Sequence, residues 1–247
     1  MTTNWYIILF VMIILLICIL NYNNNIDSFD NSTGEEIINC FINPSFKTSS
    51  FLMPSDLIGQ PTIGYLKPRV TLTVFKDLKC GMCKRFTEYI YPVIKEKYID
   101  KNLLAYTTIV IAMLPGSRPA ALSALCVYNQ NVDLFDKYVN YIYKIQKSEN
   151  EDWATPEFLV KAASNIPGID TKQLYNCIIT AKYSNQLNKN MDLAMKVMGF
   201  RYDTPGVFVN SERIENVSVD TVSNAIDRAL KKCPGNIFQQ PHVEVIK

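Results

Sequence analysis

The sequence predicts an α/β domain in which a β-α-β unit and a β-β-α unit are separated by an inserted all-helical subdomain, behind an N-terminal membrane segment and a linker. Three observations predict this order. Short runs rich in β-branched residues flank a helical pattern between residues 58 and 116. Residues 117–199 look helical almost throughout. Residues 200–233 return to strands before a last helix.

The composition fits one globular domain with an elaboration. The chain has 247 residues, of which 48% are hydrophobic and 19% are charged, so it can bury one substantial core. The formal net charge is +2, and no dense run of Lys and Arg is interleaved with aromatic residues. The sequence therefore gives no electrostatic reason to expect a nucleic-acid partner.

The N-terminal residues are expected to meet a membrane. Trp5 to Leu20 is an unbroken apolar stretch of 16 residues, which lies between a signal-peptide core and a full span in length. No small-residue cleavage site of the A-x-A kind is found, so residues 1–22 are interpreted as a signal-anchor or transmembrane segment. The acidic residues that follow suit export of the rest of the chain. We expect the body in the periplasm or at the extracytoplasmic face, anchored to the membrane, or secreted if the signal is cleaved.

A linker and the first half of the domain come next. Residues 23–57 carry Asn, Ser and isolated apolar residues without a clear period, which is typical of a linker. In residues 58–116 we expect a strand from Val70 to Phe75, a turn at Cys80, a helix from Lys84 to Tyr98 and a strand from Leu103 to Leu114. The two strands are expected to be parallel, joined by a right-handed crossover.

The inserted subdomain covers residues 117–199. Its predicted helices are Pro119 to Asn129, Val132 to Lys147, Thr155 to Ser164, Thr171 to Tyr183 and Asn185 to Met198. Several starts follow capping rules: Thr155 precedes a proline at the first helical position, and Asp170 or Thr171 caps the next helix. Tyr138, Tyr141 and Tyr143 are interpreted as packing residues of these helices.

The second half of the domain covers residues 200–233, and residues 234–247 form a tail. A strand is expected at Gly206 to Asn210, a turn through Asn210, Ser211 and Glu212, and a second strand around Ile214 to Val217. The domain then ends in a helix from Asp220 to Lys231.

The residues Cys80-Gly81-Met82-Cys83 carry the chemistry. A CxxC motif between a strand and a helix places its first sulfur at the helix N-terminus, where free backbone N–H groups and the helix dipole stabilise a thiolate. The second sulfur follows one turn later and is close enough to form a disulfide with the first. The motif therefore predicts a redox dithiol with Cys80 as the nucleophile.

A zinc site is the competing interpretation of this motif. A closed structural zinc site needs four ligands, and the chain has no second CxxC or CxxH motif and only one histidine, His242. We therefore expect no metal.

Three segments in this order carry a family resemblance: Ile58-Gly-Gln-Pro61, Val74-Phe-Lys-Asp-Leu-Lys-Cys80-Gly-Met-Cys83, and Gly199 to Asn210 with its Thr204-Pro205 pair. The chain from about Ile58 to Leu230 resembles the thioredoxin superfamily, and the inserted helices resemble its DsbA-like branch of exported bacterial thiol:disulfide oxidoreductases. The resemblance implies a thioredoxin fold, Cys80 as a surface nucleophile, Cys83 as the resolving thiol, and Thr204 and Pro205 as a cis-proline loop facing them. A cis bond before proline is inexpensive, and the turn can leave the preceding backbone free to pair with an extended substrate.

The resemblance also implies the reaction and the partners. The expected activity is the introduction of disulfides into reduced or unfolded exported proteins, by dithiol-disulfide exchange and without a bound cofactor. A membrane protein of the DsbB kind would reoxidise the dithiol.

One position departs from the family pattern. The family often has a buried acid six positions before the first cysteine, where this chain has Val74. Asp77 is a candidate substitute as proton relay, and a carboxylate on a surface turn is the alternative. The two residues between the cysteines are Gly81 and Met82, whereas the most oxidising members of the family have a histidine there.

Further cysteines suggest structural disulfides. Cys126 and Cys177 lie on separate predicted helices of the insertion. Some DsbA-like relatives have a second disulfide at similar places, which makes this pair a candidate bridge, with two buried free thiols as the alternative. The pairing of Cys40 with Cys233 stays open.

Two other functions remain open. One is disulfide isomerase or reductase activity, because Thr before the cis-proline occurs in isomerising relatives. The other is a membrane-tethered binding or assembly protein of the same fold that holds the thiols of a partner.

Overall fold

The computed structural model describes residues 52–65, 70–199 and 203–232. The chain divides into two compact units, Met1–Asn39 and Cys40–Lys247, and all described residues belong to the second. The predicted membrane segment, most of the predicted linker, Cys18, Cys40, Cys233 and the tail lie outside the described residues. Among the helices of the described ranges, none combines the length and the apolar character needed to cross a membrane.

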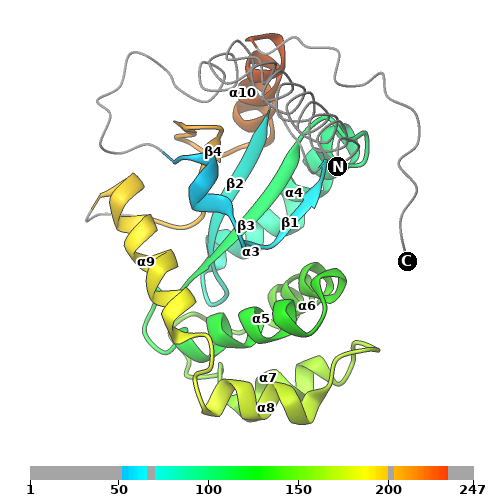
Figure 1. Cartoon of the computed structure of the whole chain (residues 1–247), viewed down its shortest axis with the longest axis vertical. Coiled ribbons are helices and arrows are strands. Elements are labelled where there is room, and N and C mark those ends of the chain that lie inside the picture. The colour runs from blue at the N-terminus through cyan, green and yellow to red at the C-terminus, as the bar shows by residue number, and fades with distance from the viewer. Residues whose placement is uncertain (1–51, 66–69, 200–202, 233–247) are drawn as a thin grey trace, which may run out of the picture. The chain divides into compact units, whose positions relative to one another are not determined.

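The centre of the domain is a five-stranded mixed sheet of order β1-β3-β2-β4-β5 (Figure 1). Strands β2 (Thr71–Asp77) and β3 (Ala105–Ile111) are parallel, with Thr71 opposite Ala105 and Asp77 opposite Ile111. Every residue of both strands is buried, as expected for strands in the middle of a sheet covered on both faces. Strand β4 (Gly206–Val209) is antiparallel to β2, so the second half of the domain is joined directly to the strand that leads into the CxxC motif.

The crossover between β2 and β3 is helical from Gly81 to Ile99, and so begins three residues earlier than predicted. It consists of α3 (Gly81–Arg85), the π-helical η2 (Phe86–Ile90), α4 (Tyr91–Ile94) and the π-helical η3 (Lys95–Ile99). Pro92, at the start of α4, has no N–H to donate to the preceding turn, which is a physical reason for the wider winding at η2.

The insertion contains helices at all five predicted places, with bounds that differ by a few residues. They are α5 (Arg118–Gln130), α6 (Val132–Ile145), α7 (Pro156–Ala163), α8 (Thr171–Ile179) and α9 (Ser184–Met198). The side chains of Thr155 and Asp170 accept hydrogen bonds from the backbone of α7 and α8, so both act as N-caps. Helix α8 ends four residues before the predicted end.

The core has three parts that follow these layers. On one face of the sheet, β2 residues such as Leu72 and Val74 pack against the crossover helix and α10 (Val219–Lys232). On the other face, Phe75, Ile109 and Phe208 pack against α9. The largest part joins α5 to α8 and includes Cys80 and Cys83, so the cysteines of the CxxC motif belong to the core of the inserted subdomain.

Three features at the ends of the domain differ from what the sequence led us to expect. The strand expected around Ile214–Val217 is instead β5 (Glu212–Arg213), because Asn210 takes a positive φ of 53° and the chain reverses within two residues. The end of the predicted linker holds a 3₁₀ helix, η1 (Pro54–Leu57), and buried Leu52 packs against the α9 face of the sheet. Strand β1 (Thr62–Gly64), antiparallel to β3, was not predicted, because three half-buried residues are too few to show a period.

Candidate active site

The two cysteines of the motif lie at the point where β2 passes into the crossover helix. Cys80 is the N-cap residue of α3 and Cys83 lies in its first turn, and both are free thiols in this structure. Cys80 was expected at the surface, but only 6% of it is exposed, because it packs into the core beneath the inserted helices. Cys83 is fully buried. A substrate sulfur can therefore reach Cys80 but not Cys83.

Cys80 is tuned to ionise. Its pKa is lowered from 9.0 to about 6, chiefly by a hydrogen bond from the Cys83 thiol, against the opposing effect of burial. The Thr204 side chain and the backbone N–H groups of Cys83 and Met82 lower the pKa further. At neutral pH the thiolate is therefore the main form of Cys80.

The loop that carries Thr204 and Pro205 lies directly against Cys80. The Thr204–Pro205 peptide bond is cis, and the Cys80 thiol donates a hydrogen bond of 3.4 Å to the Thr204 carbonyl oxygen. The buried Thr204 hydroxyl has no hydrogen-bond partner among the described residues while Cys80 is a thiol. When the thiol ionises it loses its donor, and this hydroxyl is then free to donate to the thiolate.

Cys83 is tuned in the opposite direction. Burial raises the pKa of the Cys83 thiol well above 9.0, and the hydrogen bond and charge of Cys80 raise it further. A hydrogen bond with the backbone of Asp77 and the positive charge of Lys76 act against this increase. The pair therefore combines an ionised outer sulfur with a protonated inner sulfur.

Asp77 is fully buried, so it is not the surface carboxylate that the sequence left open as an alternative. One carboxylate oxygen accepts hydrogen bonds from the backbone N–H groups of Met113 and Leu114 and from the Ser117 hydroxyl, at 2.7 to 2.8 Å. The other accepts one from the N–H of Lys79. These bonds connect the end of β2 to the segment after β3. The role of Asp77 as a proton relay stays a prediction.

Two residues of α6 and the turn after it hold the active-site turn, and sequence reasoning missed this role. The Tyr143 hydroxyl donates to the carbonyl oxygen of Asp77 at 3.1 Å. The side-chain amide of Gln146 donates to the carbonyl oxygens of Leu78 and Cys80 at 2.8 and 3.3 Å. Tyr143 was predicted only to pack, and no local spacing links residues so far apart in the sequence.

The two residues between the cysteines face outward. Met82 is 55% exposed and forms an apolar contact surface beside Cys80. The N–H of Gly81 donates to a carboxylate oxygen of exposed Glu149 at 3.2 Å. Glu149 thus places a negative charge at the entrance to the site.

Lys76 is a further residue that sequence reasoning missed. It lies in β2 on the same face as Leu72 and Val74, and only 2% of it is exposed. The alternation of side chains along a strand was the available signal, because it places Lys76 on a buried face two residues after Val74.

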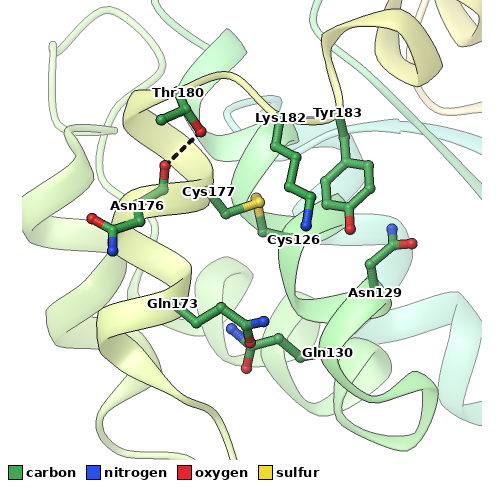
Figure 2. Close-up of a pocket in the computed structure, with 9 residues that line it drawn as sticks. All are labelled: Cys126, Asn129, Gln130, Gln173, Asn176, Cys177, Thr180, Lys182 and Tyr183. Carbon is green, nitrogen blue, oxygen red and sulfur yellow. Dashed lines mark hydrogen bonds between the residues drawn. A yellow bond between two sulfur atoms is a disulfide. The ribbon is translucent and has the colours of Figure 1, made fainter.

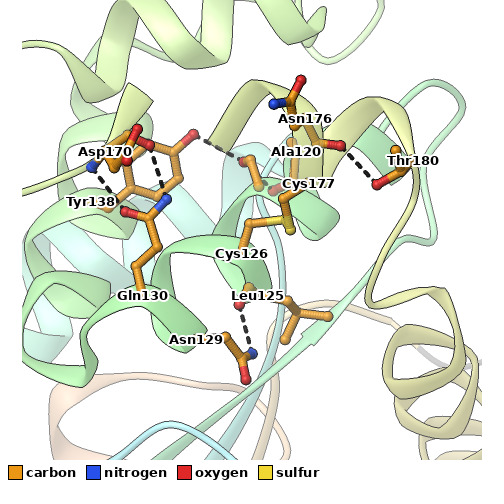
Figure 3. Close-up of a disulfide and its surroundings, with 11 residues drawn as sticks. Ala120, Leu125, Cys126, Asn129, Gln130, Tyr138, Asp170, Asn176, Cys177 and Thr180 are labelled. Carbon is orange, nitrogen blue, oxygen red and sulfur yellow. Dashed lines mark hydrogen bonds between the residues drawn. A yellow bond between two sulfur atoms is a disulfide. The ribbon is translucent and has the colours of Figure 1, made fainter. Parts of the chain in front are cut away.

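Cys126 and Cys177 form a disulfide that joins α5 to α8, with their Cα atoms 6.1 Å apart. Figure 3 shows the bond next to a second link between the same helices, in which the Gln130 side chain exchanges hydrogen bonds with the backbone of Asp170. A pocket of about 190 Å³ lies beside the disulfide (Figure 2). It is lined by Cys126, Asn129, Gln130, Gln173, Asn176, Cys177, Thr180, Lys182 and Tyr183. None of these belongs to the CxxC segment or the cis-proline loop.

Comparison with known proteins agrees with this geometry. The family model described as "Thioredoxin" matches residues 56–228. "Disulfide bond formation protein D" of Bacillus subtilis is 30% identical over 175 residues, which cover 70% of this chain and 78% of that protein. A putative protein-disulfide oxidoreductase of Rickettsia typhi is 27% identical over 207 residues, which cover 82% of this chain and 74% of that protein.

Solved structures give the same result. The crystal structure of oxidised BdbD from Bacillus subtilis is 28% identical and superposes with a TM-score of 0.69, over 75% of this chain and all of that one. Chlamydia trachomatis DsbA is 29% identical with a TM-score of 0.65, over 75% of this chain and 96% of that one. The similarity thus covers both the sheet and the inserted helices.

Proposed function

The chain belongs to the thioredoxin family, as a DsbA-like thiol:disulfide oxidoreductase, and from this premise we propose that Cys80 and Cys83 oxidise the thiols of exported proteins. The observation that supports this most is the lowered pKa of Cys80, together with its contact with the Thr204 carbonyl oxygen. A thiolate of low pKa stabilises the reduced form of a dithiol, which makes its disulfide a stronger oxidant.

The reaction proceeds by two exchanges. A substrate thiolate attacks Cys80 Sγ in the Cys80–Cys83 disulfide, the bond between the two cysteines breaks, and its electron pair goes to Cys83 Sγ. A second substrate thiolate then attacks the substrate sulfur of the mixed disulfide and releases Cys80 as a thiolate. The substrate loses two electrons and forms one disulfide, and the protein dithiol gains them.

The surroundings of Cys80 suit an extended protein substrate. The backbone at Thr204 and Pro205 and the exposed Met82 side chain flank Cys80. A substrate segment that pairs with the loop backbone would bring its own cysteine to Cys80 without a requirement for a particular sequence.

The partners and the location follow from the redox chemistry. A dithiol that oxidises substrates must return its electrons, and we assign that step to a membrane reoxidase of the DsbB kind. The catalytic body is placed outside the cytoplasm, where disulfides persist, and the segment of residues 1–22 is assigned as its anchor. The Cys126–Cys177 disulfide fits such an oxidising compartment.

The reduction potential of Cys80–Cys83 tests the direction of the reaction. The full-length chain in detergent micelles is equilibrated with glutathione buffers, with Cys80→Ser as the blank. We expect a potential more positive than about −180 mV, the value of an isomerase-type couple. A potential near or below about −200 mV would identify an isomerase or reductase instead. If no couple appears that the blank abolishes, the protein holds thiols without exchanging them.

A further inference from the structure

The buried Lys76 side chain has no role in the reaction described so far. Its ammonium group donates a hydrogen bond of 3.1 Å to the Thr87 hydroxyl. It also lies 5.2 to 5.7 Å from the centres of four aromatic rings, those of Phe86, Tyr91, Tyr106 and Tyr143. These rings come from η2, α4, β3 and α6, so the cation is enclosed from several sides. The faces of aromatic rings attract a cation, which makes this enclosure a site for a positive charge.

The enclosure provides no counter-charge. No carboxylate of the described residues forms an ion pair with Lys76. Asp136 accepts a hydrogen bond from the Tyr91 hydroxyl at 3.0 Å, so this acid contacts the outer end of one ring and not the ammonium group. A buried cation without an anion costs stability. A purely structural role would be filled better by an apolar side chain of the same length.

The titratable groups that face Lys76 leave one candidate for the missing anion. Tyr91 and Tyr143 remain protonated, because burial raises the pKa of each well above 10. Tyr106 is a buried phenol whose hydroxyl has no partner among the described residues. The remaining acid is Cys83, which lies four residues before Thr87 on the same helical run, so its side chain is on the side of the helix that Lys76 contacts. The positive charge of Lys76 also lowers the pKa of the Cys83 thiol. A negative charge on Cys83 Sγ is therefore the charge that Lys76 can balance.

We propose that Lys76 is a positioning residue that stabilises the negative charge on Cys83 Sγ while the Cys80–Cys83 disulfide opens or closes. The inference rests on the proposed exchange at Cys80. When a substrate thiolate attacks Cys80, Cys83 leaves as a thiolate, and it later takes up one proton from solvent. In the reverse direction, Cys83 must lose that proton before it attacks the mixed disulfide. The family often has a buried acid at the position of Val74. Lys76 lies on the same face of β2, two residues closer to the motif, and carries the opposite charge.

This role predicts an effect on rates rather than on the equilibrium. At neutral pH both stable forms of Cys83 are uncharged, one as a thiol and one in the disulfide, whereas the thiolate exists only during exchange. Lys76 therefore stabilises the species between the two stable forms. Removal of its charge should slow reduction and oxidation by the same factor.

The test is the substitution Lys76→Met in the full-length chain, measured as the rate of exchange with glutathione in detergent micelles between pH 6.5 and 8.5. We expect both rate constants to fall about ten-fold, after correction for the fraction of ionised glutathione, because a leaving thiol of higher pKa leaves more slowly. The equilibrium constant for exchange with glutathione should change less than about three-fold, because Cys83 is uncharged in both stable forms.

The matched control is Lys97→Met, which removes a lysine that also lies near the centre of an aromatic ring, that of Tyr98 at 4.8 Å, but in η3 at the far end of the crossover helix. Its rates should remain within about two-fold of the wild type, since Lys97 lies 14 residues after Cys83 on the helical run and contacts neither cysteine. The thermal midpoint of Lys76→Met should equal or exceed that of the wild type, because a methionine fills the enclosure without a buried charge.

Three results would overturn the proposal: unchanged rates in Lys76→Met, an equal decrease in Lys97→Met, or a decrease in rate that accompanies a lower thermal midpoint. The last result would identify Lys76 as a structural residue. A wild-type protein that does not exchange with glutathione at all would instead overturn the proposed function, so the two failures are distinguishable.

Discussion

Cys80 combines two properties that a disulfide-forming thiol needs. With a pKa of about 6 it is mainly ionised at neutral pH, and a thiol of low pKa is a good leaving group when a substrate disulfide is released. The buried Cys83, with its raised pKa, is a poor leaving group unless its charge is stabilised. The opening of the protein disulfide is therefore the step that depends most on the surroundings of Cys83.

The Thr204 hydroxyl is expected to set part of the Cys80 pKa. Thr204→Val keeps the shape of the side chain and removes the donor that stabilises the thiolate. Because a hydrogen bond to a charged group contributes roughly 1.5 kcal/mol or more, we expect the pKa to rise from about 6 to about 7. The measurement is a titration of thiolate absorbance in the reduced protein.

Thr204→Ser is the control, because it retains the hydroxyl and should keep a pKa near 6. If Thr204→Val also titrates near 6, the N–H groups of the helix and the Cys83 thiol account for the whole stabilisation.

Among the secondary-structure elements, α6 links the inserted subdomain to the chemistry. Tyr143 and Gln146 hold carbonyl groups of the segment Asp77 to Cys80, so the turn that presents Cys80 is fixed by a helix outside the β-α-β unit. The insertion is thus a support for the active-site turn as well as a cover over it.

The disulfide between α5 and α8 is expected to stabilise this support. It closes a loop across a sequence separation of 51, for which chain-entropy estimates give about 4 kcal/mol and measured values are often about 2 to 4 kcal/mol. The double substitution Cys126→Ala with Cys177→Ala should therefore lower the free energy of unfolding by about 2 to 4 kcal/mol. Denaturant unfolding of the oxidised protein measures this change.

The same double variant should retain the Cys80 pKa of about 6, because neither Cys126 nor Cys177 is among the groups that set it. A pKa that moves toward 9 would show that the disulfide also maintains the geometry of the active-site turn.

The order of the elements could be predicted because each carries a local signal. Short stretches of sequence are enough to show these signals: the β-branched run before Cys80, the caps at Thr155 and Asp170, and the CxxC motif. The short strands β1 and β5 could not be placed, because two or three half-buried residues show no period and their pairing depends on partners far along the chain. The start of the helix after Cys80 was predicted three residues too late, because the first residue of α3 is a glycine, which the helical pattern did not include.

In the candidate site, too, the residues with a local sequence signal could be predicted, and those placed by distant contacts could not. The cysteines and the Thr204–Pro205 pair follow from motifs, and the structure places them together. Tyr143 and Gln146 were missed because their contacts with the turn are set by tertiary packing alone. Lys76 was missed although its strand position indicated burial, because a lysine is usually assigned to the surface.

At the scale of the whole molecule, the ionisation of Cys80 couples redox state to stability. The thiol has a usual pKa of 9.0 in the unfolded chain and about 6 in the folded, reduced protein. An acid whose pKa is lower in the folded state stabilises that state fully above the unfolded pKa, and this contribution disappears as the pH falls through the folded pKa. The reduced protein therefore gains stability between about pH 6 and pH 9, and the oxidised protein, which has no thiol at Cys80, does not.

We expect the thermal midpoint of the reduced protein, compared with that of Cys80→Ser under the same mild reducing conditions, to rise by at least about 2 °C from pH 5 to pH 8. Groups that titrate in both proteins cancel in this difference. Cys83 does not interfere below pH 9, because its raised pKa keeps it protonated when folded and its unfolded pKa is 9.0.

Two midpoint curves that stay parallel from pH 5 to pH 8 would mean that folding does not stabilise the Cys80 thiolate. The disulfide would then lack the thermodynamic reason to be a strong oxidant, since that strength and the extra stability of the reduced protein have one origin. A difference that grows with pH, together with a potential more positive than about −180 mV, would tie the direction of the reaction to the contacts of a single sulfur atom.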